Sequence, residues 1–164
     1  HATHPIAALQ TEYSLWTRDV EDDVLGLCKD LGVGFVAYSP LGRGILAGAV
    51  TGQDSLAESD RRRDHPRYQG DNLEANLRLV RPVLELAEAK GVTPAQIALA
   101  WLLSRGDHLV VIPGTRKIDH LESNAGAMDV TLGADEISIL DTAFPRAAAQ
   151  GPRYPAGAMK WLKL

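Results

Sequence analysis

The chain has 164 residues, a formal net charge of −4 and a hydrophobic fraction of 45%. A mildly acidic chain lacks the basic face that nucleic acids and anionic membranes favour, and no run approaches the roughly 20 apolar residues of a membrane span. We therefore expect neither nucleic acid nor a membrane as a partner. The polar start of the chain also differs from a secretory signal, so we expect a cytoplasmic location.

The first half of the sequence predicts two strands joined by a helix. An apolar run at residues 6–10 predicts a buried strand, and the acids at 21–23 favour the first turn of a helix that ends near Gly32. Residues 33–38 predict the second strand. Residues 42–72 show no sustained hydrophobic period and contain several Gly and Pro residues, which is typical of a long mobile loop that serves as a lid or binding loop.

The second half of the sequence predicts a helix over 73–90, another that begins at Thr93-Pro94, a strand over 109–112 and helices over 118–128 and 134–144. The apolar face of the first of these helices is expected to comprise Leu73, Leu77, Val80, Leu84 and Ala87. Strands that alternate with helices in this way predict parallel pairing with right-handed crossovers.

Residues 110–117 have the pattern of an anion-binding site. A β-branched strand ends in a turn at Pro113 and Gly114, and Arg116 and Lys117 stand just before a predicted helix start. Backbone N–H groups and the positive end of the helix dipole attract a phosphate at such a place, and the two cations add full charges. The same pattern also fits a strand, a turn and a helix whose basic residues are only solvated.

A second segment, residues 34–44, has the same construction: an apolar strand, then Tyr38, Ser39 and a Gly-rich turn that carries Arg43. Together with residues 8–15, it resembles the aldo-keto reductases, a family of nicotinamide-dependent (β/α)8 barrels. The resemblance runs nearly end to end and suggests the bacterial branch that acts on small aldehydes and ketones. Three further segments carry it: residues 66–70, 92–102 and 153–155.

The resemblance implies an α/β fold of the (β/α)8 TIM-barrel type. A complete barrel takes roughly 250 residues or more, and the first predicted strand matches the sixth strand of the family. We therefore expect one partial domain, residues 1–164, which forms the C-terminal portion of the barrel with about three parallel strands. Whether the chain is a complete gene product or a fragment is left open. Its open sheet edges predict association with the missing N-terminal half or as a homo-oligomer.

The resemblance also implies a nicotinamide site at the ends of the first two strands. Gln10 occupies the place of the family glutamine that binds the nicotinamide carboxamide, and an amide suits this role because it offers both a donor and an acceptor. Tyr38 matches the aromatic residue that stacks on the nicotinamide ring. The turn that follows is expected to contact the pyrophosphate through Ser39, Leu41, Gly42 and Arg43.

After the third strand, Gly114, Thr115 and Arg116 match the positions that hold the adenosine 2′-phosphate, which favours NADP over NAD as the cofactor. Many relatives have lysine in place of Gly114 and arginine in place of His120, so the 2′-phosphate site is expected to depend mainly on Arg116. Asn124 matches the family asparagine that binds the adenine.

The function that the resemblance implies is NADPH-dependent reduction of small aldehydes and ketones to alcohols. The Asp, Tyr, Lys and His that transfer protons in the family lie on earlier strands, so we expect no catalytic residue in this chain. It is expected to supply the cofactor-binding half of the enzyme. The alternative is a non-catalytic half-barrel that binds a nucleotide or associates with itself.

Other reactive or polar residues have simpler interpretations. Trp16 fits a substrate-pocket wall and the core about equally well. The arginines at 61–63 could contact a phosphate, but a solvated loop is favoured. The lone Cys28 is expected to be a buried thiol without a disulfide, and the histidines lack metal-ligand spacing, so no metal site is expected.

Overall fold

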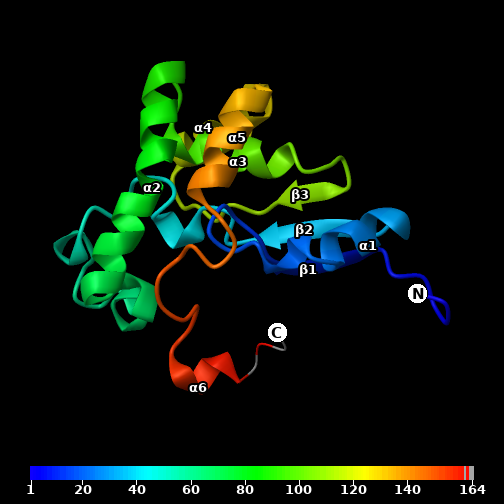
Figure 1. The fold of residues 1–164 in the computed structure, drawn as a ribbon, viewed down its shortest axis with the longest axis horizontal. Helices are drawn as coiled ribbons and strands as arrows, with labels where there is room; N and C mark the ends of the chain where they lie inside the picture. The colour runs from blue at the N-terminus through cyan, green and yellow to red at the C-terminus, as the bar shows by residue number, and fades with distance from the viewer. Residues whose placement is uncertain (161, 163–164) are drawn as a thin grey trace.

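The computed structural model describes residues 1–160 and 162, and it contains a three-stranded parallel sheet (Figure 1). Strands β1 (Ala8–Glu12), β2 (Gly34–Tyr38) and β3 (Leu109–Val111) lie side by side in that order. Both pairs are parallel, as the alternation of strands and helices predicts. The α/β fold class is therefore confirmed.

Helices connect the strands and follow them along the chain. Their bounds are α1 (Val24–Asp30), α2 (Gly70–Lys90), α3 (Pro94–Leu103), α4 (Ile118–Ala125), α5 (Ala134–Ala143) and α6 (Ala156–Met159). Helix α3 begins where the sequence predicts, because Thr93 and Gln96 form a capping box. Strand β3 and helices α4 and α5 end slightly before their predicted residues. No described helix combines the length and apolarity that crossing a bilayer needs.

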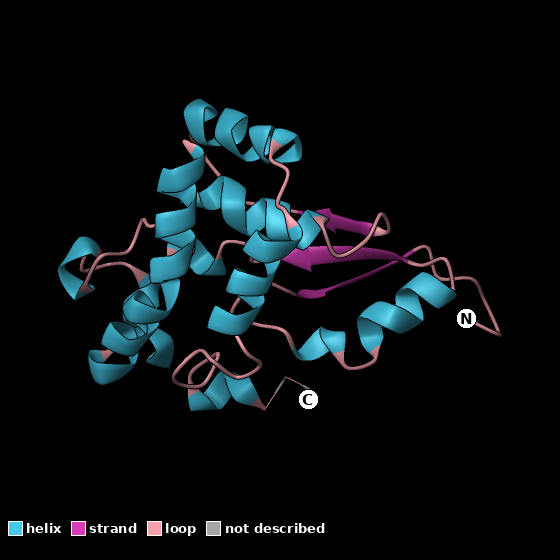
Figure 2. Ribbon diagram, turned by 45° about the horizontal axis from the view of Figure 1, so that its top comes forward, coloured by secondary structure: helices cyan, strands magenta, loops and turns pink. Residues whose placement is uncertain are grey.

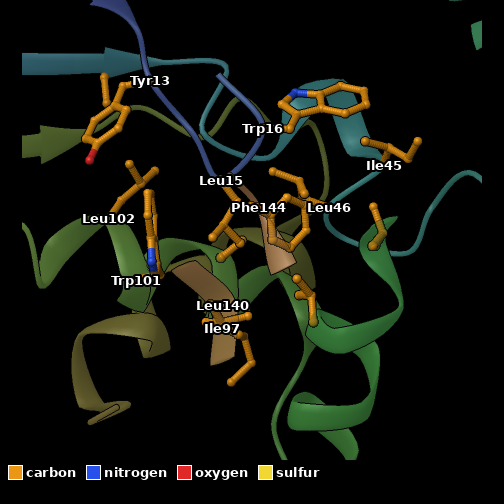
Figure 3. Packing of buried hydrophobic residues seen from close by; sticks show 14 of the residues in the cluster. Tyr13, Leu15, Trp16, Ile45, Leu46, Ile97, Trp101, Leu102, Leu140 and Phe144 are labelled. Atoms are coloured by element: carbon orange, nitrogen blue, oxygen red, sulfur yellow. The ribbon is translucent and has the colours of Figure 1, made fainter. Parts of the chain in front are cut away.

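The apolar core lies against one face of the sheet. Phe35 and Leu109 are buried there on β2 and β3, and Tyr13 packs edge-on against Phe35 with ring centroids 5.9 Å apart. Figure 3 shows the core side chains between the turns after β1 and β2 and helices α3 and α5, which contribute Trp101 and Leu140. These helices fix the strands, and the strands position the turns at their carboxyl ends.

The opposite face of the sheet is open. Gln10, Val36 and Val110 are partners across the three strands, so they share this face. Gln10 is exposed, and the apolar Val110 and Ile112 are 53% and 46% exposed. A parallel sheet normally has both faces covered, so this row of side chains lacks its usual cover. Figure 2 shows the three strands at the side of a larger group of helices.

Strand β1 starts and ends later than the predicted range of 6–10. Its pairing with β2 continues from Ala8 to Glu12, so the ladder includes the polar residues Thr11 and Glu12. The prediction followed the apolar run alone. It was wrong because the neighbouring strand, rather than hydrophobicity, sets the limits of a hydrogen-bonded ladder.

The acids at 21–23 do not begin helix α1. Residues Asp19–Glu21 form a short 3-10 turn, and α1 starts at Val24. Glu21 instead pairs with Arg18 at 2.8 Å and accepts a hydrogen bond from the Tyr13 hydroxyl. The carboxylate therefore serves a tertiary contact, and the predicted helix start was wrong.

Residues 42–69, most of the segment 42–72 that was predicted as a long mobile loop, form a series of turns packed against the core, so they are not an open loop, and their mobility stays a prediction. They form 3-10 turns at Gly42–Gly44, Gln53–Ser55, Arg61–Asp64 and Pro66–Tyr68, and α2 begins at Gly70. The buried side chains of this segment include Ile45, Leu46, Val50, Leu56 and Tyr68. Because a series of turns has no fixed period, their spacing gives no hydrophobic pattern. The segment, cyan to green in Figure 1, lies beside the carboxyl ends of the strands.

Helix α2 turns a slightly different face to the core than the sequence predicts. Val83 is fully buried, whereas Leu84 is 40% exposed. The buried row also contains Asn76, whose Nδ2 donates to the backbone oxygens of Arg67 and Gln150. The buried face of α2 was mispredicted because it contains a polar residue, which interrupts the apolar pattern. The hydrogen bonds of this residue connect the chain after α5 to α2.

Candidate cofactor-binding site

A cavity of about 1120 Å³ lies at the carboxyl ends of β2 and β3. Ligands of parallel α/β sheets bind outside this edge, where loops and helix N-termini meet. The cavity brings together most of the residues that the sequence predicts for a cofactor: Tyr38, Ser39, Leu41, Arg43, Gly114, Thr115 and Arg116. The two anion-type turns, far apart in sequence, therefore form one site.

Three of the predicted residues do not line this cavity: Gln10, Gly42 and Asn124. Gln10 lies in the middle of β1 on the open face of the sheet, because the strand continues to Glu12. Gly42 is a buried residue of the turn after β2, and Asn124 is half-buried on α4. Their contacts with a cofactor stay predictions.

The turn after β2 has an unusual backbone. Ser39 and Arg43 have φ angles of 51° and 54°, and Gly42 has 53°. Side chains rarely occupy this left-handed region, and residues held there often belong to ligand sites. Gly42 has a second constraint, since a Cβ at this position would lie 2.7 Å from the indole Nε1 of Trp16. The shape of the turn therefore depends on the packing beneath it.

Glu12 and Tyr154 contact residues of the predicted site, although neither was predicted as a site residue. Arg43 Nη2 lies 3.0 Å from Glu12 Oε2 and 2.9 Å from the Tyr154 hydroxyl. The Tyr154 hydroxyl is also 3.3 Å from that of Tyr38. Burial raises the pKa of Tyr38, so its hydroxyl stays protonated at neutral pH. The carboxylate fixes the Arg43 side chain, and the C-terminal tail brings the Tyr154 hydroxyl against both Arg43 and Tyr38.

The other end of the cavity is basic. Arg116, Lys117 and His120 line it after β3, and Arg62 adds a further cation to the wall beside the turn after β2, where it donates to the Arg43 carbonyl oxygen. Arg62 is held in place by Asp60, with Nη2 2.6 Å from the carboxylate, and this hydrogen-bonded pair lowers the pKa of Asp60 to about 2. Part of this contact has a sequence signal, because an Asp at the start of a turn often accepts from the backbone N–H two residues later, as Asp60 does from Arg62.

Two side chains with open interpretations are now placed. Trp16 belongs to the core, because it is 3% exposed and lies against the Tyr68 ring and the Arg67 guanidinium. Arg62 lines the cavity, so the favoured interpretation of a purely solvated arginine cluster was wrong for this residue.

Cys28 is buried and free, as predicted. Within residues 1–160 and 162, no three metal-ligating side chains are grouped to hold an ion.

Known proteins resemble this chain in sequence and define its family. The model of the aldo/keto reductase family matches residues 1–144. A soybean (Glycine max) protein named probable aldo-keto reductase 1 is 43% identical over 157 residues, which are 96% of this chain and 45% of the relative. The chain therefore belongs to the aldo-keto reductase family.

Two solved structures extend the comparison to three dimensions. A thermostable aldo-keto reductase in complex with the inhibitor epalrestat has a TM-score of 0.62 and 31% identity, over 85% of this chain and 40% of that structure. An aldo-keto reductase from Klebsiella pneumoniae in complex with NADPH has a TM-score of 0.60 and 29% identity, over 91% and 43%. The sheet and its helices are thus part of a TIM-type barrel, and the chain spans less than half the length of these relatives.

Proposed function

We propose that this chain forms the NADP-binding part of an aldo-keto reductase, as one domain of residues 1–164 that contributes three strands to the barrel. The observation that carries the proposal is the cavity at the ends of β2 and β3, which joins the turn after Tyr38 to the turn at Gly114. The Klebsiella relative in complex with NADPH supports the choice of cofactor.

The chemistry of the cavity wall fits a dinucleotide phosphate. Arg43 lines the cavity, and its buried Nη1 has no hydrogen-bond partner among the described residues, so the guanidinium keeps one unused donor. Arg62, Arg116 and Lys117 provide positive charge at the wall and favour an additional phosphate over a neutral ribose. Helix α4 begins directly after Lys117, and its N-terminus attracts the same anion.

Each predicted residue then has a role in this proposal. Tyr38 would stack on the nicotinamide, and Gln10 would hold the carboxamide. The turn of Ser39, Leu41, Gly42 and Arg43 would receive the pyrophosphate. Gly114, Thr115 and Arg116 would hold the 2′-phosphate, and Asn124 the adenine.

Bound NADPH would supply a hydride to the carbonyl carbon of a small aldehyde or ketone. The carbonyl oxygen must also receive a proton from a positioned acid, and no residue of this chain matches the proton-transferring residues of the family. We therefore propose that the 164-residue chain binds the cofactor without catalysing turnover by itself. Steady reduction of an aromatic aldehyde by a preparation free of any longer enzyme would contradict this.

The open sheet and helix surfaces support association with the rest of a barrel or with a second copy. Leu27 on α1 and Ile118 and Leu121 on α4 are more than half exposed, in addition to the apolar row on the open face. Apolar surface of this kind is usually covered by a partner.

The proposal is tested by titrating the 164-residue chain with NADPH and following the nicotinamide fluorescence. Saturable binding is expected, and Arg62→Ala should weaken it about threefold or more, because a charge-assisted contact is lost. Arg81→Ala is the matched control, since this arginine also pairs with a carboxylate but lies 77% exposed on α2, outside the cavity. Lack of saturable binding by the unmodified chain would overturn the proposed function.

A further inference from the structure

Tyr68 lies directly beneath the turn of residues 41–44. It is fully buried, and its hydroxyl donates a hydrogen bond of 2.5 Å to the Gly42 carbonyl oxygen. Its ring packs edge-on against Trp16 and His65, with centroids 6.0 and 6.5 Å away. Burial also raises the pKa of the hydroxyl, which stays a donor at neutral pH. The tyrosine therefore presents a fixed donor to the turn.

This hydrogen bond acts on the least favourable part of the turn backbone. Gly42 and Arg43 are consecutive residues with left-handed φ angles, and Arg43 pays a steric cost there because it has a Cβ. The peptide between them is planar, so holding the Gly42 carbonyl also sets the direction of the Arg43 N–H, which points the opposite way. Tyr68 thus controls the orientation of one amide of the turn.

A second contact holds the next peptide. Arg62 Nη1 donates to the Arg43 carbonyl oxygen at 2.8 Å, and Asp60 holds the Arg62 side chain. Two successive carbonyls of the turn are therefore bound by side chains from residues 60–68. The N–H groups of Gly42 and Gly44 donate to the carbonyl oxygens of Ser39 and Leu41 at 2.9 Å, so among residues 42–44 the Arg43 N–H is the one without a backbone acceptor. A backbone N–H of this kind can donate to a phosphate oxygen.

The two sides of the turn are distinct. Leu41, Arg43 and Gly44 line the cavity, whereas Gly42 and Tyr68 do not. The tyrosine hydroxyl therefore acts from behind the turn and has no path to a ligand in the cavity. A role in cofactor binding must pass through the backbone.

We propose that Tyr68 is a positioning residue for the pyrophosphate of the cofactor, because its bond to Gly42 fixes the turn that receives this group. The inference rests on the proposed function, since it assumes that the cavity binds a dinucleotide. The inference gives residues 60–68 a specific role, which is to hold the backbone that would bind the pyrophosphate.

The test compares Tyr68→Phe with Tyr13→Phe in the full 164-residue chain. Tyr13 is a matched control, because it is also fully buried and its hydroxyl donates to Glu21 at 2.8 Å, outside the cavity. Tyr68→Phe should weaken NADPH binding about three- to tenfold, the scale of one hydrogen bond. Tyr13→Phe should leave the affinity within about twofold of the original, because its lost bond does not reach the turn.

A second ligand separates positioning from general damage to the fold. Adenosine 2′-monophosphate carries the adenine and the 2′-phosphate but no pyrophosphate, so Tyr68→Phe should leave its affinity unchanged. Equal weakening of both ligands, or unchanged NADPH binding by Tyr68→Phe, would overturn the role of Tyr68 while the proposed function stands. Absence of NADPH binding by the unmodified chain would overturn the proposed function itself.

Discussion

The carboxylate of Glu12, at the end of β1, lies 3.0 Å from the guanidinium of Arg43 in the turn after β2. The Glu12 side chain is fully buried, and the Arg43 side chain is 18% exposed. The pair thus joins two strand ends inside the protein. Removing one partner of a buried pair leaves the other charge without compensation, which costs more than the pair itself contributes.

Glu12→Gln should lower the free energy of unfolding by about 3 kcal/mol, because Arg43 loses its carboxylate inside the fold. Urea denaturation of the two proteins measures this difference. Glu85→Gln is the matched control: Glu85 pairs with Arg81 but is 60% exposed, so its loss should change stability by less than about 1 kcal/mol. Equal effects of the two substitutions would show that burial of the Glu12 pair has no energetic consequence.

The pair of Asp60 and Arg62 gives a prediction for pH. Hydrogen bonds from Arg62 lower the pKa of Asp60 in the folded chain to about 2 from an ordinary value of 3.8. A lowered carboxyl pKa stabilises the fold above the unfolded value, and this contribution is lost as the pH falls through the folded value. Between about pH 4 and pH 2, the unmodified chain should therefore lose more stability than Asp60→Asn. If the two proteins lose the same stability between about pH 4 and pH 2, the proposed effect of Arg62 on the pKa of Asp60 is contradicted.

The backbone of the turn gives a third prediction. Gly42→Ala should destabilise the fold by about 1–3 kcal/mol, because the new Cβ meets Trp16 and the residue has a left-handed φ. Gly26→Ala serves as the control, since its Cβ would meet no atom within 4 Å and the position is in helix α1. The control should keep the stability or raise it by about 0.5–1 kcal/mol. Thermal unfolding followed by circular dichroism distinguishes the two.

The open apolar surface predicts the assembly of the isolated chain. We expect the purified 164 residues to self-associate, most simply as a dimer, because Val110, Ile112 and Ile118 are about half exposed or more. Sedimentation velocity at micromolar concentration measures this. A sharply folded monomer, with slow hydrogen exchange at the outer edges of β1 and β3, would show that the chain covers its own sheet edges.

The parts of the fold that sequence reasoning predicts are those with a regular period. The β-branched run at β3 and the Thr93 cap of α3 are local signals, and the structure contains both elements, with α3 beginning at its predicted residue and β3 one residue shorter than predicted. The packed segment after Gly42 has no period, because its buried side chains come from successive turns. Glu12 in β1 was missed for a similar reason, since a charged residue ends an apolar pattern even when a tertiary partner allows its burial.

The residues of the candidate site also fall into those that local motifs predict and those that only the fold brings together. Tyr38 and Arg116 lie in continuous motifs, so the sequence alone indicates them, and the structure brings both to one cavity. Arg43 contacts Tyr154 across 111 residues of sequence and Glu12 across 31, and Arg62 contacts the Arg43 backbone across 19. A local sequence pattern does not connect residues this far apart in the chain, so these contacts could be found only in the folded structure.

The central claim is that the cavity between the turns at Tyr38 and Gly114 binds NADP in preference to NAD. Calorimetric titration of the 164-residue chain with NADPH and with NADH tests it most directly. We predict tighter binding of NADPH, and Arg116→Ala should remove about 1–3 kcal/mol of that preference, while Arg81→Ala should keep it. Equal affinity for the two cofactors, or a preference that Arg116→Ala leaves intact, would contradict the account.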